Sequence, residues 1–229
     1  MLTKKKRISK KEMKEDKLVT SYYSAYNYFL ENQARILIGL AAVALVIVAI
    51  VLISNKRSND NLAAANQLAK VVTLYESGSF QEAIDGQPAS NIVGLKSIVE
   101  NYGSTENGET AKIYLANAYT FVNNLDEAYK LYDDYSGSNK LFKSTALAGQ
   151  ASYFESKNEY KKAADLYKKA AQISAGNPSN AEYLLKTGIN LMKLGKNEEA
   201  KSLFKEIKND YKFSPVVQEI DRYLIQVEG

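Results

Sequence analysis

Cysteine and histidine do not occur in the sequence of 229 residues. Without cysteine the chain has no disulfide framework, no thiolate metal site and no cysteine nucleophile. Without histidine it has no imidazole base, no Ser–His pair and no histidine-ligated zinc. Most familiar hydrolytic and metal chemistry is therefore excluded, and we expect the protein to be neither an enzyme nor the carrier of a cofactor.

Tryptophan is also absent, and 12 glycines and 3 prolines give the composition of a folded protein. The sequence offers no glycine-rich phosphate loop for a small-molecule substrate, because Gly103, Gly108 and Gly137 lie in separate predicted turns. The acidic pairs Glu198–Glu199 and Asp133–Asp134 invite a paired-carboxylate interpretation. Neighbouring side chains in a helix diverge by about 100°, however, so these carboxylates are predicted to be solvated charges.

Positive charge is concentrated near the N-terminus. Residues 1–35 hold nine Lys/Arg and four Asp/Glu, a net +5, and Lys56 and Arg57 add two more. Residues 58–229 carry 19 basic and 22 acidic side chains, a net −3, which with the +7 of the preceding residues gives the overall +4. A mildly acidic main domain argues against nucleic acid as its ligand.

An uninterrupted apolar run of eighteen residues extends from Ile36 to Ile53. As a helix it covers about 27 Å, close to the thickness of a bilayer core. A buried core helix seldom lacks polar residues for so long. A cleaved signal peptide would have a shorter charged region and small residues at its exit, which the residues after Leu52 do not provide. We therefore predict an uncleaved transmembrane signal anchor over residues 36–54.

The charges flanking this run predict its orientation. Basic residues are far more frequent before it, so residues 1–35 should stay in the cytoplasm and residues 58–229 should cross the membrane. Residues 18–34 place Tyr22, Tyr26 and Phe29 on one helical face, which favours an interfacial helix over an irregular tail. The basic residues 4–17 are interpreted as a solvated arm that meets anionic lipid.

An internal repeat follows the apolar run. Four times an alanine stands nine residues after a large apolar residue, and the alanines are 45, 35 and 37 residues apart. In the last three units a small residue precedes the large one by three places, and an aromatic follows the alanine by four. The four pairs are Leu74–Ala83, Tyr119–Ala128, Phe154–Ala163 and Leu191–Ala200; the small residues are Ala116, Ala151 and Gly188; the aromatics are Tyr132, Tyr167 and Phe204.

Each unit is predicted to be a pair of helices joined by a turn. Turns are expected at Asn123–Asn124, at Lys157–Asn158 and at Gly195, and helices are expected to begin at Pro178 and Pro215. The first unit is interrupted at residues 85–88 and is interpreted as a hairpin with an insertion of about ten residues. A final helix over residues 216–227 should cap the stack.

This pattern resembles the tetratricopeptide repeat over residues 62–227. The chain departs from that family in lacking tryptophan and in units of 35 to 45 residues. The resemblance implies an all-α fold, in which one transmembrane helix precedes an α-solenoid over residues 58–229. It also implies a protein–protein interaction module, and a non-repetitive helical bundle is the alternative.

The inner face of such a solenoid is lined by the first helix of each hairpin. The predicted groove mixes apolar groups with amide and hydroxyl groups, which suits capture of unfolded or extended segments. Its residues are Ile113, Asn117, Phe121, Ser152, Glu155, Leu185, Ile189 and Met192. An error of one residue in register would make several of them core residues. Tyr114, Tyr129 and Tyr153 either decorate a binding surface or pack between hairpins.

The whole arrangement also resembles the YfgM-like family of ancillary subunits of the bacterial SecYEG translocon. The resemblance rests on the basic arm, the single anchor, and the residues Tyr102-Gly103-Ser104-Thr105 followed by Ala111, Leu115-Ala116 and Tyr119. It implies a place in the bacterial inner membrane, with a periplasmic repeat domain beside the translocon and a periplasmic prolyl isomerase and chaperone. An envelope scaffold for division or peptidoglycan synthesis is the alternative.

Overall fold

The protein is described here from a computed structural model that defines the backbone of residues 10–228 and the side chains of residues 17–228. The chain separates into two compact units, residues 1–56 and residues 57–229. It is 81% helical, so the predicted all-α class is confirmed. The basic arm predicted for residues 4–17 falls largely outside the described side chains.

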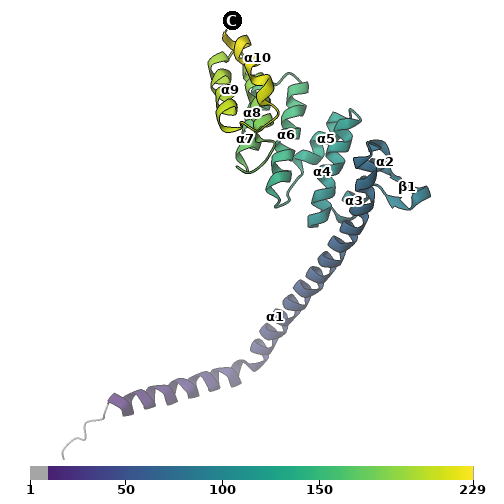
Figure 1. Cartoon of the computed structure of the whole chain (residues 1–229). Helices are drawn as coiled ribbons and strands as arrows, with labels where there is room; N and C mark the ends of the chain where they lie inside the picture. The colour runs from purple at the N-terminus through teal and green to yellow at the C-terminus, as the bar shows by residue number, and fades with distance from the viewer. Residues whose placement is uncertain (1–9, 229) are drawn as a thin grey trace, which may run out of the picture. The chain divides into compact units, whose positions relative to one another are not determined.

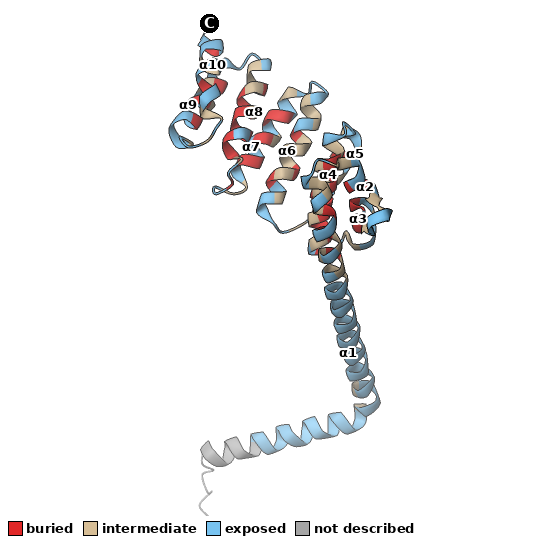
Figure 2. Ribbon diagram, turned by 45° about the vertical axis from the view of Figure 1, so that its right-hand side comes forward, coloured by how far each residue is buried: buried red, intermediate tan, exposed pale blue. Residues whose placement is uncertain are grey.

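The helix α1 (Lys10–Glu76) contains the apolar run (Figure 1). Its backbone is non-helical only at Asn32, where the Asn32 Nδ2 donates a hydrogen bond of 3.0 Å to the carbonyl of Tyr28. Such local bonds of asparagine compete with the helical ladder. Within the described chain α1 is the one helix long and apolar enough to cross a membrane, and none of its apolar window is buried (Figure 2).

The last turns of α1 belong to the second unit and form the first helix of the first hairpin. Ala64, Leu68 and Val71 are buried in one cluster with Ala111 and Leu115 of α4 (Glu106–Phe121). Polar contacts fasten the same turns: Arg57 Nη2 donates to the carbonyl of Ser104 over 2.8 Å, and the Asn107 amide donates to Asn61 Oδ1 over 2.8 Å. The sequence did not predict that the first helix of this hairpin begins before residue 62.

Successive helical hairpins then stack on one another. The hairpins are α4 with α5 (Leu125–Asp133), α6 (Lys140–Ser156) with α7 (Tyr160–Gln172), and α8 (Asn180–Lys193) with α9 (Asn197–Asp210), followed by α10 (Val217–Glu228). From α3 onward each helix packs against the next one along the chain, as a solenoid requires (Figure 1).

One turn geometry recurs in the hairpins. Gly78, Asn123, Asn158 and Gly195 have left-handed backbones, with φ between 60° and 81°. Each lies five residues before a repeat alanine. The amide that follows each of them donates to the carbonyl of the large residue of the repeat, at 2.8–3.0 Å, for Leu74, Tyr119, Phe154 and Leu191. The repeat detected in the sequence is thus the signature of one helix-ending motif, which favours glycine and asparagine.

The small and large residues of the repeat pack together. Ala83, Ala128, Ala163 and Ala200 are at most 2% exposed, and so close a contact requires a small side chain. At Gly188 the contact is closest, because a Cβ atom there would lie 2.3 Å from the ring of Phe204. Small residues at these positions therefore let the two helices of a hairpin approach closely.

The predicted insertion in the first unit contains a short β-hairpin that the sequence did not suggest. After α2 (Phe80–Asp85) come β1 (Gly86–Gln87), η1 (Pro88–Ser90), β2 (Ile92–Val93) and α3 (Leu95–Tyr102). The strands are antiparallel, with Gly86 opposite Val93. A Cβ atom at Gly86 would lie 2.6 Å from the Gly94 amide nitrogen, so the crossing needs glycine.

Two predicted helix starts were wrong by two residues. Helix α8 begins at Asn180 and α10 at Val217, so Pro178 and Pro215 lie in the preceding turns. The Asn177 Oδ1 accepts a hydrogen bond from the Ser179 amide and stabilises that turn instead of capping the helix. The predicted final helix is present: α10 buries Ile220 and Val227 and exposes the charged residues between them.

Candidate protein-binding surfaces

Six of the eight predicted groove residues are at least partly accessible. Phe121 is 61% exposed and Ser152 is exposed, whereas Asn117, Glu155, Ile189 and Met192 are half-buried. They lie on α4, α6 and α8, the first helices of three hairpins. We call the surface made by these six residues the first-helix face.

The other two predicted groove residues lie in the core. Ile113 is 1% exposed and packs in a cluster with Ala128 and Tyr132, while Leu185 is 5% exposed. Both point between hairpins instead of toward a ligand. They illustrate the register ambiguity of a helix whose polar and apolar residues are intermixed, as they are around Ile113.

An aromatic cluster occupies the α4 end of the first-helix face. Phe121 stacks on Phe80 with centroids 4.2 Å apart, and Tyr75 meets the edges of Phe80 and Tyr114 at 5.4 and 5.0 Å. These rings come from α1, α2 and α4, so their meeting could not be seen in the sequence. The high tyrosine content was the available signal. Four joined rings with one mostly exposed are a ready contact site for apolar side chains.

Buried tyrosine hydroxyls supply polar groups beside the first-helix face. The Tyr132 hydroxyl donates to Asn117 Oδ1 over 2.7 Å, and the Tyr167 hydroxyl donates to Glu155 Oε2 over 3.2 Å. Burial raises the pKa of Tyr132 to about 12, although a hydrogen bond with Thr120 opposes the shift. Burial also raises the pKa of Tyr167. Both hydroxyls therefore remain protonated, and they hold the side chains of Asn117 and Glu155 in place.

A second aromatic group joins two hairpins. Tyr129 stacks on Tyr153 with centroids 4.4 Å apart, and the edge of Phe154 meets Tyr129 at 5.5 Å. The Tyr153 hydroxyl donates to Asp126 Oδ1 over 3.0 Å, and this bond, followed by the charge of Lys157, holds the pKa of Asp126 below its usual value. Tyr129 and Tyr153 thus serve packing between hairpins.

An ion-pair network around the buried Lys112 ties α4 to the segment after α5. Lys112, only 5% exposed, contacts Glu109 Oε1 at 2.9 Å and Asp134 Oδ2 at 2.8 Å. Burial lowers the pKa of Lys112, but the hydrogen bonds to Asp134 and Glu109 outweigh it, so the pKa lies above its usual value. Glu109 also accepts from the Ser136 amide and hydroxyl. Each charge in this network has a partner, so its role is to hold α4 and the segment after α5 together.

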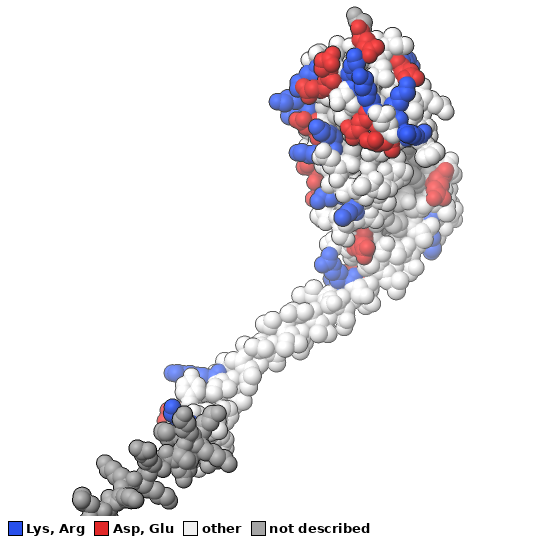
Figure 3. Space-filling view, turned by 60° about the vertical axis from the view of Figure 1, so that its left-hand side comes forward, with Lys and Arg blue, Asp and Glu red and all other residues white. Residues whose placement is uncertain are grey.

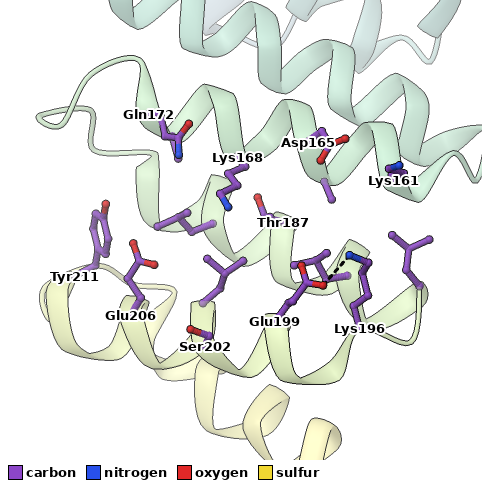
Figure 4. A pocket seen from close by; sticks show the side chains of 16 residues that line it. Lys161, Asp165, Lys168, Gln172, Thr187, Lys196, Glu199, Ser202, Glu206 and Tyr211 are labelled. Carbon is purple, nitrogen blue, oxygen red and sulfur yellow. Dashed lines mark hydrogen bonds and ion pairs between the residues drawn. The ribbon is translucent and has the colours of Figure 1, made fainter.

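A groove of about 510 Å³ runs between α7 and α9 (Figure 4). Its floor comes from α8, including Leu184, Thr187 and Leu191. Lys161, Asp165, Lys168 and Gln172 follow one wall, and Lys196, Glu199, Ser202 and Glu206 follow the other, with Tyr211 at the far end (Figure 4). No pattern in the sequence predicted this groove.

Charge divides the solenoid into two halves. Residues 58–156 carry 6 basic and 12 acidic side chains, a net −6, and we call them the acidic half. Residues 157–229 carry 13 basic and 10 acidic side chains, a net +3, and we call them the basic half. In Figure 3 charged side chains crowd the C-terminal end of the solenoid, and the adjoining surface is largely uncharged. Across the described residues no cluster of three acidic side chains is placed to hold a metal.

No protein-family model and no curated protein matches the chain. Solved structures do: a Podosopora anserina putative kinesin light chain with nearly identical TPR-like repeats aligns at 15% identity and TM-score 0.54 over 71% of this chain and 84% of that chain. A second crystal structure of that protein, carrying one substitution, aligns at 16% identity with the same coverage and score. The fold of the second unit is therefore TPR-like, preceded by one apolar N-terminal helix. Such a fold suggests a protein–protein interaction module.

Proposed function

We propose that this protein is a membrane-anchored module that captures extended polypeptide segments on its first-helix face. The observation that carries the proposal is the aromatic cluster of Tyr75, Phe80, Tyr114 and Phe121, because Phe121 is 61% exposed on a surface made of repeat helices. A single exposed aromatic residue is common on a protein surface, but a contiguous cluster of rings with an exposed face marks an interaction site.

The chemistry of capture follows from the groups present. The rings offer contact to apolar side chains in any order, so selectivity is weak. The Asn117 amide and the Glu155 carboxylate, held by tyrosine hydroxyls, offer a donor and an acceptor to the main chain of an extended segment. Segments that combine apolar and basic residues fit best, since the acidic half carries a net −6.

The apolar part of α1 supplies the anchor in this proposal. Its eighteen residues suit one crossing of a bilayer, and the basic residues before it favour a cytoplasmic N-terminus and a periplasmic solenoid in a bacterial inner membrane. The aromatic segment over residues 18–31 is helical, as an interfacial helix requires. A reporter enzyme fused after residue 60 should be active only outside the cytoplasm, and activity inside would refute the orientation.

We further propose that the module serves protein translocation, as an ancillary translocon subunit within a periplasmic chaperone network. The basic N-terminal arm, the proposed membrane anchor and the first-helix face together support this role. An envelope scaffold for division or peptidoglycan synthesis uses the same parts. Photo-crosslinking from position 121 of the full chain in membranes distinguishes the two: crosslinks to channel subunits and emerging chains support translocation, and crosslinks to wall synthases support the scaffold.

Binding to the first-helix face can be tested with a labelled, chemically unfolded globular protein and the full chain in nanodiscs. Phe121→Ser should weaken binding by about tenfold, since a central aromatic contact is worth about 1–2 kcal/mol. Phe213→Ser is the matched control, because Phe213 is fully exposed in the loop before α10 and belongs neither to the first-helix face nor to the groove between α7 and α9. Equal binding by both variants would contradict the proposed capture site.

A further inference from the structure

The groove between α7 and α9 lies on a different side of α8 from the first-helix face. Leu184, Thr187 and Leu191 line the groove, whereas Ile189 and Met192 belong to the first-helix face. At about 100° per residue these two sets point more than 90° apart around α8. A ligand in the groove would therefore leave the first-helix face free.

We propose that this groove binds an amphipathic helix of a partner protein. The walls and floor are helices, whose main-chain groups are already hydrogen-bonded within each helix. An extended segment on this floor would find few partners for its main-chain groups, because the hydroxyl of Thr187 already donates to the Tyr183 carbonyl. A helix satisfies its own main chain and needs to offer only an apolar stripe.

The size of the groove fits such a stripe. Its α7 wall extends from Lys161 to Gln172, twelve residues or about 18 Å of helix. Three turns of a partner helix have that length, and they place apolar side chains at positions i, i+3 or i+4, and i+7 on the floor. The floor meets them with Leu184 and Leu191.

The rims predict the flanks of the partner helix. Lys161, Asp165 and Lys168 on α7 and Glu206 on α9 make no ion pair within the described chain, whereas Lys196 and Glu199 pair with each other at 2.7 Å. The α7 rim therefore has a spare positive charge and the α9 rim a spare negative charge. A helix with acidic residues along one edge and basic residues along the other complements both rims.

The test uses an eighteen-residue synthetic helix with a leucine stripe, glutamates on one flank and lysines on the other. Its binding to the full chain in nanodiscs is measured by fluorescence anisotropy, with binding to empty nanodiscs subtracted. Ser202→Phe fills the groove from an exposed wall position and should raise the Kd by about tenfold. Ser152→Phe, the same change on the first-helix face, should leave the Kd unchanged.

Charge is tested separately. Lys168→Glu and Glu206→Lys should each raise the Kd by about two- to fivefold, as expected for one exposed charge pair. The neighbouring exposed residues provide matched controls, Lys169→Glu and Glu198→Lys, which lie outside the groove. A peptide with the same leucines and glutamine flanks should bind more weakly to the unaltered chain.

Several outcomes would overturn the inference. The first is that the peptide does not bind the unaltered chain. The second is that Ser202→Phe and Ser152→Phe weaken peptide binding equally, and the third is that only Ser152→Phe weakens it. Displacement of the peptide by self-association of the chain, seen by analytical ultracentrifugation, would identify a second copy as the occupant and also overturn it. Each result is independent of the capture proposed for the first-helix face, which Phe121→Ser reports.

Discussion

The acidic and basic halves of the solenoid share one backbone plan and differ in their surfaces. In both, a left-handed turn residue, a buried alanine and a large buried side chain recur at fixed spacing. The acidic half adds an exposed aromatic cluster, whereas the basic half adds a groove with charged rims. The comparison shows that the residues defining the hairpin are few, so the remaining positions are free to build two different contact surfaces.

The last hairpin also differs from the earlier hairpins in its interior. At the position four residues after the repeat alanine, the acidic half has Tyr132, whose hydroxyl holds Asn117, and the last hairpin of the basic half has Phe204, which packs on Gly188 without a polar group. Tyr167 at the start of the basic half still holds Glu155 in this way, so the position serves packing alone only in the last hairpin.

Removal of the Phe204 ring should have the largest effect. Phe204→Ala should lower the free energy of unfolding by about 3–5 kcal/mol, because a fully buried aromatic leaves a cavity. Urea unfolding of the full chain in detergent, followed by circular dichroism, measures the change. Phe213→Ala provides the control at a fully exposed phenylalanine. If Phe204→Ala lowered the free energy of unfolding no more than Phe213→Ala, Phe204 would not hold the last hairpin together.

Overpacking the crevice between α6 and α7 should cost less. Ala163→Leu should destabilise the fold by about 1–3 kcal/mol, since Ala163 is fully buried between facing backbones. Ala69→Leu is a matched change at an exposed helical site of α1 and should shift stability by less than about 0.5 kcal/mol. Equal thermal midpoints for the two variants would remove Ala163 from the hairpin interface.

The buried hydroxyl of Tyr132 predicts a pH dependence of stability. Its pKa rises from 10.0 to about 12 on folding, so the folded state holds the proton more tightly. The resulting stability is complete below pH 10 and is lost as the pH rises toward 12. At pH 11 it amounts to about 1 kcal/mol. Tyr132→Phe should reduce the decline in stability between pH 9 and pH 11.

The control for this experiment is Tyr160→Phe, which removes a hydroxyl that donates to the Asn158 side chain in the adjoining turn. That variant should retain the full decline between the two pH values. If Tyr132→Phe declined as steeply as Tyr160→Phe, burial of the Tyr132 hydroxyl would not be linked to folding.

The smallest effect concerns the turns, where the halves should behave alike. Asn123 in the acidic half and Gly195 in the basic half have φ of 60° and 72°. Asn123→Ala and Gly195→Ala should each cost about 0.5–1 kcal/mol from backbone strain alone, because nothing lies within 4 Å of a Cβ atom at Gly195. Asn123→Gly should be nearly neutral. If Asn123→Gly lowered the free energy of unfolding as much as Asn123→Ala, the asparagine side chain, and not the left-handed backbone, would be the source of the stability.

The sequence predicted the features that rest on local spacing. The alanines, the turn at Gly195 and the closing helix are confirmed because each depends on residues within about ten positions of one another. The starts of helices were predicted less well. A proline is favoured both in the first turn of a helix and in the loop before it, and Pro178 lies in the loop before α8.

The candidate surfaces were predicted less well, because they join distant residues. Phe80 and Phe121 are 41 positions apart, and the groove between α7 and α9 combines residues from three helices. Ile113 and Leu185 were predicted to face a ligand, but their apolar side chains pack between hairpins. On helices with apolar residues on more than one side, periodicity alone does not distinguish a groove from a core.

The position of α10 bears on how the stack of hairpins ends. A stack of hairpins has no inherent end, and an uncovered last hairpin would offer its seam to the next molecule and start a polymer. Ile220 and Val227 close that seam, while Glu219, Asp221 and Arg222 face water. The twelve residues of α10 thereby cover the apolar seam of the last hairpin with a helix whose outer side is charged.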